Sequence, residues 1–263
     1  MTTNGADTIE IPVWANGPDA SGNGGWSAGL LAEQLGADAI AHGVSVSLRL
    51  PPPIGRPLRV APAGSGRDVF DDDSHGAGGE SVLVMHAEPS PTSLDAPDVV
   101  RAIDADVAGR ASAGFPFREH HPFPRCVSCG IARDPGEVSL ELHCGPVDGV
   151  AVDGSRVFAD AWIPSADVPH DDDSGEVTIP AMWSALDCPS AAPVADPHAV
   201  NPSVLARITA RVATRARVGE RCVLAAWHVS SDGRQHVTRS VMVDAGGTVI
   251  AAADALWIEV RPR

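Results

Sequence analysis

Two adjacent glycines at the start of an apolar segment could support chemistry on a carbonyl group. Gly24 and Gly25 open the stretch Gly24 to Leu35, whose apolar residues have helical spacing, and Gly36 is a suitable helix stop. Backbone N–H groups at a helix start, together with the helix dipole, can polarise a carbonyl and stabilise an oxyanion. Glycine lets a ligand approach closely, although the same residues would also permit tight packing of the helix against a sheet.

Asp187 is a carboxylate at the end of a second apolar segment. Ile179 to Asp187 is predicted to form a helix with Thr178 as its N-terminal cap. The Cys188-Pro189 pair is expected to end this helix, because proline cannot continue the backbone hydrogen-bond ladder. One interpretation of Asp187 is therefore a hydrogen-bonding residue at a helix end.

Cysteine and histidine residues near the middle of the chain have part of a zinc-binding pattern. Cys126 and Cys129 have the Cys-x-x-Cys spacing of a ligand pair. His143 and Cys144 are the other candidates, but adjacent residues on a strand point to opposite faces, and a second Cys-x-x-Cys is absent. We therefore expect no metal. A phosphate-binding P-loop and a dinucleotide fingerprint are also absent from the sequence.

Two similar successions of elements follow each other along the chain. Each begins with one of the two helices and continues with alternating apolar and polar residues, which is typical of half-buried strands joined by tight turns. Between the two successions, a short helix is expected over Asp95 to Ala108, with Gly109 as its stop. The first succession is predicted to contain strands at Val44 to Leu50, from Leu58, at Val69 to Phe70 and at Ser81 to Ala87, with a turn at Gly76 to Gly79. The second is predicted to contain strands at Ile208 to Val218, Cys222 to Val229, Gln235 to Val243 and Thr248 to Val260. The layout indicates an internal repeat of two antiparallel meanders, each preceded by a helix.

Four segments resemble the thioesterase-like superfamily, and acyl-CoA thioesterase II in particular. They are Asn16 to Gly29, Ser47 to Val60, Phe123 to Gly130 and Trp183 to Pro189, and with the final meander they cover most of the chain. The resemblance implies an α+β double hotdog, in which two tandem antiparallel sheets each wrap around a helix. We place the N-terminal hotdog domain at residues 1–115 and the C-terminal one at residues 116–263.

The resemblance also implies hydrolysis of an acyl thioester by water, with no cofactor. Asp187 matches the aspartate that orients the water in acyl-CoA thioesterase II. The family's glutamine position falls near Ala255, and Thr209 lies close to its threonine position. We take Asp187 and Thr209 as the catalytic candidates. The substrate-binding candidates are Gly24, Gly25, Trp26 and Trp183, although core packing is the competing interpretation of the tryptophans.

A second hypothesis is a noncatalytic protein that binds acyl-CoA or acts as a scaffold, because the expected glutamine is missing. A hotdog hydratase or dehydratase is a third option. It would need an aspartate and a histidine close to the helix start, and the sequence around Gly24 has no histidine.

Composition limits the partners. The formal net charge of −15 argues against binding to nucleic acid or to an anionic membrane surface. No run approaches the roughly 18–20 apolar residues of a membrane span, and Met1 to Pro12 lacks the pattern of a secretory signal. The five cysteines are an odd number, which favours a reduced, cytoplasmic protein. We expect acyl-CoA or another acyl thioester as the ligand, and association of two chains into a homodimer is an option that the sequence leaves open.

Overall fold

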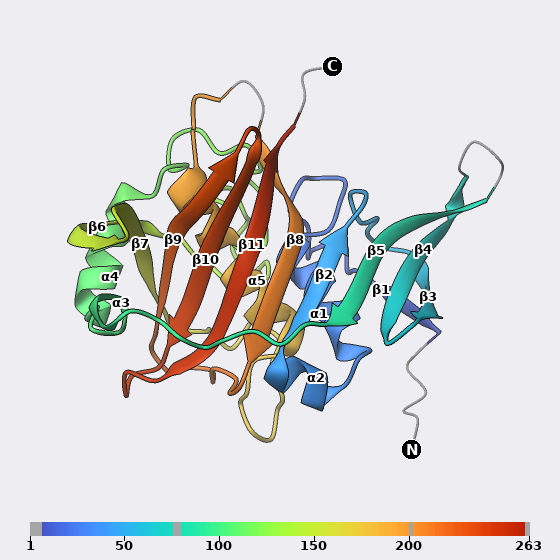
Figure 1. Cartoon of the computed structure of the whole chain (residues 1–263), viewed down its shortest axis with the longest axis horizontal. Coiled ribbons are helices and arrows are strands. Elements are labelled where there is room, and N and C mark those ends of the chain that lie inside the picture. The colour runs from blue at the N-terminus through green and yellow to red at the C-terminus, as the bar shows by residue number, and fades with distance from the viewer. Residues whose placement is uncertain (1–6, 76–79, 200–201, 261–263) are drawn as a thin grey trace.

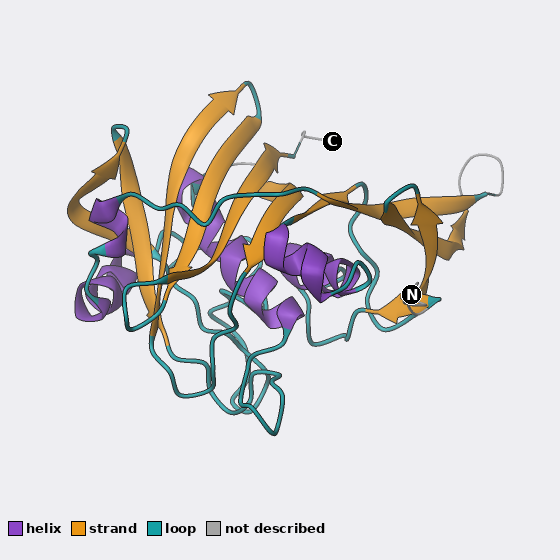
Figure 2. Cartoon of the chain, turned by 60° about the horizontal axis from the view of Figure 1, so that its bottom comes forward, coloured by secondary structure: helices purple, strands orange, loops and turns teal. Residues whose placement is uncertain are grey.

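The computed structural model describes residues 7–75, 80–199 and 202–260. Figure 1 shows the strands side by side in one curved sheet, and Figure 2 shows α1 and α5 together on one face of it. The elements in chain order are β1 (Thr8–Glu10), α1 (Gly24–Glu33), α2 (Ala37–His42), β2 (Val44–Leu48), β3 (Pro57–Ala63), β4 (Gly66–His75), β5 (Ser81–Pro89), α3 (Asp98–Arg101), α4 (Ala105–Ala111), η1 (Ser112–Gly114), β6 (Gly145–Val152), β7 (Ser155–Trp162), α5 (Ile179–Ala191), η2 (Ala192–Val194), β8 (Ser203–Val212), β9 (Cys222–Asp232), β10 (Gln235–Val243) and β11 (Val249–Glu259).

The sheet joins the two halves of the chain edge to edge. Within the described residues its order is β1-β3-β4-β5-β2-β8-β11-β10-β9-β7-β6. The neighbouring strands are antiparallel, and β2 pairs with β8 in the register Val44↔Ala210 and Val46↔Ile208. A strand from each half therefore meets at the centre, and this is the double hotdog arrangement expected from the sequence.

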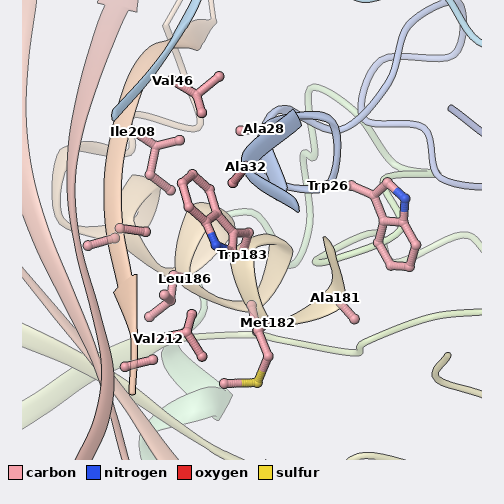
Figure 3. Packing of buried hydrophobic residues seen from close by; sticks show 14 of the residues in the cluster. Trp26, Ala28, Ala32, Val46, Ala181, Met182, Trp183, Leu186, Ile208 and Val212 are labelled. Atoms are coloured by element: carbon pink, nitrogen blue, oxygen red, sulfur yellow. The ribbon is translucent and has the colours of Figure 1, made fainter. Parts of the chain in front are cut away.

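Helices α1 and α5 pack against each other beneath this central junction. Gly25 and Gly29 make the close approach possible, because a Cβ at Gly25 would lie 2.5 Å from the carbonyl oxygen of Trp183, and one at Gly29 would lie 2.6 Å from Cα of Pro180. Trp183 fills the space between α1 and the sheet, beside Ala32 and Ile208 (Figure 3). The apolar residues of both helices and of the inner sheet face form one continuous core.

The other face of the sheet is covered by the connection between the two halves. The chain crosses that face after β5 (Figure 1), where the Arg239 guanidinium donates to the carbonyl oxygens of Ser93 and Asp95. Helices α3 and α4 then pack on β6 and β7, over a second core that contains Val157, Trp227 and Val241. These helices precede residue 115 in sequence, yet they cover strands of the second half.

The structure corrects several predicted element boundaries. The predicted single helix at 95–108 is two short helices, and Gly109 lies within α4 rather than ending it. The strand predicted to reach Val218 ends at Val212. Its alternation continues because the next segment pairs with a different partner, as the Val218 N–H donates to the Gly175 carbonyl. Strands β1, β6 and β7 were not predicted, and the turn predicted at 76–79 lies outside the described residues.

Helix α5 continues through Pro189 to Ala191, so the predicted helix end was wrong. Pro189 lacks the N–H that would bond to the carbonyl of Ala185, four residues earlier. Side-chain hydroxyls bond to the next two carbonyls of the helix: Ser240 donates to the oxygen of Leu186 at 2.7 Å, and Ser190 donates to that of Asp187 at 2.6 Å. This support from β10 and from within the helix carries α5 past the proline.

None of the helices in the described part of the chain is long and apolar enough to cross a membrane.

Candidate active site between the two central helices

A cavity of about 1380 Å³ opens where α1 begins and α5 ends. Its walls come from segments that are far apart in sequence: residues within 17–24, 48–52, 117–131, 187–199, 202–206 and 257–259. Gly24 and Asp187 both border it, so the structure brings these two predicted site residues together. Leu50, Ile131 and Val204 give it exposed apolar surface, which suits an acyl chain.

Asp187 is held at the cavity wall by the backbone of α1. Its side chain is buried, with 2% exposure, and Oδ2 accepts a hydrogen bond of 2.7 Å from the N–H of Gly25. Oδ1 is also buried, and it has no hydrogen-bond partner within the described residues. Burial raises the pKa of Asp187 to about 7, the Gly25 N–H opposes this rise, and the nearby Cys126 adds to it. A carboxylate with one oxygen fixed and one free can hold and activate a water molecule.

The N–H groups at the start of α1 have different tasks. That of Gly25 is used by Asp187, and that of Trp26 donates to the Asn23 side chain at 2.8 Å, so neither is free for an oxyanion. The N–H of Gly24 has no hydrogen-bond partner among the described residues. A Cβ on Gly24 would lie 3.4 Å from Asp187 Oδ2, which places this glycine beside the carboxylate. Of these three N–H groups, that of Gly24 is therefore the one left to donate to a ligand.

Asn23 connects α1, α5 and the central loop. It is the N-terminal cap of α1, and its Oδ1 also accepts a hydrogen bond of 3.0 Å from the Ser184 hydroxyl. Its Nδ2 donates to the sulfur atoms of Cys126 and Cys188, each at 3.6 Å. The side chain thus holds three segments of the site in fixed relation to one another.

Three cysteines converge next to Asp187. The sulfur atoms of Cys126, Cys129 and Cys188 all lie within 4.8 Å of one another. Hydrogen bonds from the thiols of Cys129 and Cys188 hold the pKa of Cys126 well below its usual value. Because Cys129 and Cys188 donate to Cys126, their own pKa values are raised well above the ordinary value. The cluster therefore favours a single thiolate, shared through hydrogen bonds.

The structure does not bring Thr209, Trp26 or Trp183 to the cavity. Thr209 shares a register pair with Asp254, which contacts the crossing connection through Thr92, so it lies on the sheet face opposite the helices. Its hydroxyl donates to Ser45 at 3.1 Å. The alternation of a strand places Ile208 and Ala210 toward α5 and turns Thr209 away.

Both tryptophans are core residues rather than part of a ligand-binding wall. Trp183 is fully buried beneath the sheet, and Trp26 lies on the far side of α1, where its ring packs edge-on against that of Trp14 at 4.8 Å (Figure 3). Of the substrate-binding candidates, Gly24 borders the cavity and Gly25 serves helix packing and the contact with Asp187.

Ser27 stands in a Gly-x-Ser-x-Gly sequence, Gly25 to Gly29, but it is not a nucleophile. It lies inside α1 rather than at a turn between a strand and a helix, where a nucleophile elbow would place it. It is fully buried, and its hydroxyl donates to the Asn23 carbonyl at 2.7 Å.

Sequence reasoning missed Asn23 and Cys188. Asn23 had a usable signal, because asparagine directly before a predicted helix start is a preferred N-terminal cap. Cys188 had none, since it is 62 residues from Cys126. The zinc candidates that the sequence offered are also separated, because Cys144 lies in the main core and His143 packs against Phe115.

The fold is similar to that of several solved thioesterase structures. A tesB protein of Mycobacterium avium subspecies paratuberculosis is 15% identical with a TM-score of 0.55, and the match covers 96% of this chain and 91% of that one. An acyl-CoA thioesterase II of Mycobacterium marinum is 16% identical with a TM-score of 0.55, over 92% and 90% of the two chains. A putative thioesterase of Novosphingobium aromaticivorans is 14% identical with a TM-score of 0.57, over 97% and 95%.

No family model and no curated protein matches the sequence. A protein of Alicyclobacillus acidocaldarius described as having a hot dog fold is 11% identical, with a TM-score of 0.55 over 97% of this chain and 93% of that one. The chain therefore has a double hotdog fold, similar to the folds of these solved structures.

Proposed function

We propose that this protein hydrolyses an acyl thioester by attack of a water molecule held at Asp187. The observation that carries the proposal is the burial of the Asp187 side chain and the different hydrogen bonding of its two carboxylate oxygens. It is buried at the end of a large cavity, with Oδ2 fixed by Gly25 and Oδ1 without a partner among the described residues. The similarity to thioesterase II structures supports the same reaction class.

The reaction follows from the positions of two groups. The acyl chain occupies the apolar cavity, and the thioester carbonyl accepts a hydrogen bond from the N–H of Gly24 at the positive end of α1. Asp187 takes a proton from the water as its oxygen adds to the carbonyl carbon, and negative charge collects on the carbonyl oxygen. The carbon–sulfur bond then breaks, and the proton passes to the departing thiolate.

A noncatalytic acyl-thioester binding protein is the second candidate, and a specific observation favours it. Thr209 faces away from Asp187, and the position expected for a glutamine is the buried, apolar Ala255. Two groups that assist the aspartate in the resembling family therefore have no equivalent at those positions. Under this alternative, the cavity binds the acyl group without cleaving it.

The deciding experiment compares Asp187→Asn with wild type on acyl-CoAs of increasing chain length. Free acid and free CoA should be measured by mass spectrometry, because a thiol reagent would also react with the protein's cysteines. We expect wild type to turn over and Asp187→Asn to lose about a hundredfold or more in kcat, as is typical for loss of a general base.

Asp160→Asn is the matched control, because Asp160 is a second buried aspartate, lies in β7 and is not part of the cavity wall. It should retain activity. Calorimetric binding of acyl-CoA without turnover would support the binding protein. Equal turnover by wild type and Asp187→Asn would exclude the proposed role of Asp187.

A further inference from the structure

The three cysteines beside Asp187 have the geometry of a metal site. The sulfur atoms of Cys126 and Cys188 are 3.6 Å apart, and Cys129 Sγ lies within 4.8 Å of both. Zinc–sulfur bonds of about 2.3 Å in tetrahedral geometry place two sulfurs about 3.8 Å apart. Among the described residues, no other group of three or more potential ligands converges in this way.

Two of the three cysteines lie on a short turn that is held in place by hydrogen bonds. The N–H of Gly130 donates to the Cys126 carbonyl at 2.8 Å, and a Cβ on Gly130 would lie 2.5 Å from that same oxygen. The turn is tied to α5 by the Ser128 hydroxyl, which donates to the Ser184 carbonyl at 2.9 Å. Because Cys188 is itself on α5, this contact sets the distance between the Cys-x-x-Cys pair and the third cysteine.

The surroundings also suit bound thiolates. The Asn23 amide donates to the sulfurs of Cys126 and Cys188, as supporting groups around metal ligands do. Phe115 lies in the small apolar cluster with Cys126 and Cys129, with Phe117 and Phe123 packed against it. All three cysteines border the cavity, so a ligand that enters it can reach them.

We propose that Cys126, Cys129 and Cys188 form a three-thiolate site for a zinc ion, whose fourth coordination position faces the cavity. Three sulfur ligands in this geometry favour zinc among the common divalent metals. Three protein ligands with an adjacent cavity are typical of zinc sites that keep one position for water or for an entering ligand, here a water or a thiol. The proposal does not depend on thioester hydrolysis by Asp187.

Cobalt(II) gives a direct test, because its absorption reports thiolate ligands and tetrahedral geometry without any activity measurement. Reduced, metal-free full-length protein should be titrated with cobalt(II) under anaerobic conditions. We expect a sulfur-to-cobalt charge-transfer band that saturates at about one ion per chain. Added zinc should then abolish this band by displacing the cobalt.

Cysteine variants locate the site. Cys188→Ser and Cys126→Ser should lose the charge-transfer band or most of its intensity. Cys222→Ser is the matched control, because Cys222 lies in β9 and is not part of the cluster, and it should bind as wild type does. Absence of the band in wild type, or an unchanged band in Cys188→Ser, would overturn the proposal.

A measurement on wild type alone covers the case in which a variant fails to fold. Zinc should protect Cys126, Cys129 and Cys188 from alkylation, as mapped by peptide mass spectrometry, and should leave the labelling of Cys144 and Cys222 unchanged. Labelling of the three cluster cysteines that is the same with and without zinc would refute the site independently of any substitution.

Discussion

The backbone N–H of Gly25 donates to Oδ2 of Asp187 over 2.7 Å and so joins the start of α1 to the last turns of α5. The same glycine lies so close to α5 that a Cβ on it would be 2.5 Å from Asp187 Cβ. Helix packing and placement of the carboxylate therefore depend on one position. The two halves of the chain are joined not only along the sheet but also through the side chain proposed to act on substrate.

We expect Gly25→Ala to destabilise the protein and to impair turnover. The added methyl group must push α1 and α5 apart, and such overpacking costs about 1–3 kcal/mol. Urea denaturation would measure the free energy of unfolding, and kcat would report displacement of Asp187. Gly109→Ala in α4 is the control, because its Cβ would find ordinary contacts at 3.7 Å or more. It should be neutral, or stabilising by up to about 1 kcal/mol. A Gly25→Ala variant as stable as wild type would contradict the packing argument.

Thr209→Val should leave turnover nearly unchanged. The hydroxyl donates to Ser45 on the sheet face away from the cavity, so its removal costs at most about 1 kcal/mol of stability and takes no group from the site. Steady-state kinetics should give kcat within about twofold of wild type, since no transition-state contact is lost. A hundredfold loss in a folded variant would show that Thr209 reaches the reacting atoms by a route the structure does not contain.

The repeated meanders could be recognised from sequence because each strand shows its own alternation and each turn its own glycines. The sequence does not show in the same way which neighbouring strand each of these segments pairs with. The N–H groups of Ala213 and Thr214 still donate to Ile250 of β11, but residues 216–218 leave that strand and pair with residues 175–177. Strand β6 lies at the edge of the sheet with β7 beside it, and both follow a long loop where the alternation of apolar residues is short.

The candidate site was predictable where local signals coincide with function. Gly24 is the first residue of α1 and Asp187 lies in the last turns of α5, so the two meet once these helices pack together. Asn23 and Cys188 contribute through contacts between residues that are far apart in the sequence. The Asn23 side chain donates to Cys126, 103 positions away, and Cys188 contacts Cys126 across 62 positions. The prediction that Thr209 takes part in catalysis has a geometric weakness, because a shift of one residue along a strand exchanges the two faces of the sheet.

We expect Arg49 to bind the phosphates of CoA and so to favour an acyl-CoA over an acyl thioester that lacks the nucleotide. It is the only arginine among the described residues that line the cavity, and the chain has no lysine. The other charged lining residues include Glu119, Asp196 and Glu259, which would repel the phosphates of CoA. We expect Arg49→Gln to raise KM for acyl-CoA about fivefold, equivalent to about 1 kcal/mol for an exposed ion pair.

The matching measurement for Arg49 uses the acyl pantetheine thioester, which lacks the nucleotide. Its KM should be the same for wild type and Arg49→Gln. Arg156→Gln makes the same change of net charge away from the cavity and should affect neither substrate. Equal KM values of wild type and Arg49→Gln for acyl-CoA would mean that Arg49 does not contact the phosphates.

Asp160 should make stability fall as the pH rises from about 4 to about 6. Burial raises its pKa from 3.8 to about 6, against hydrogen bonds from the N–H groups of His143 and Ala161. Between these two pH values the folded state keeps a proton that the unfolded state releases. The free energy of unfolding therefore decreases with rising pH, by about 1.4 kcal/mol per pH unit where the effect is steepest. The stabilisation from protonated Asp160 is fully present below the pKa of this residue in the unfolded state, and it is lost above its pKa in the folded state.

Asp160→Asn removes the titration and isolates this effect. The amide cannot accept both N–H groups through two oxygens, so the variant carries a cost that does not change with pH. Relative to wild type, it should gain about 2.4 kcal/mol between pH 4 and pH 7, because the folded and unfolded pKa values are roughly two units apart and pH 4 lies just above the lower one. Urea denaturation of both proteins across that range gives the difference directly, and the other titrating groups cancel in the comparison. A difference that stays constant with pH would mean that the pKa of Asp160 is not raised in the folded protein.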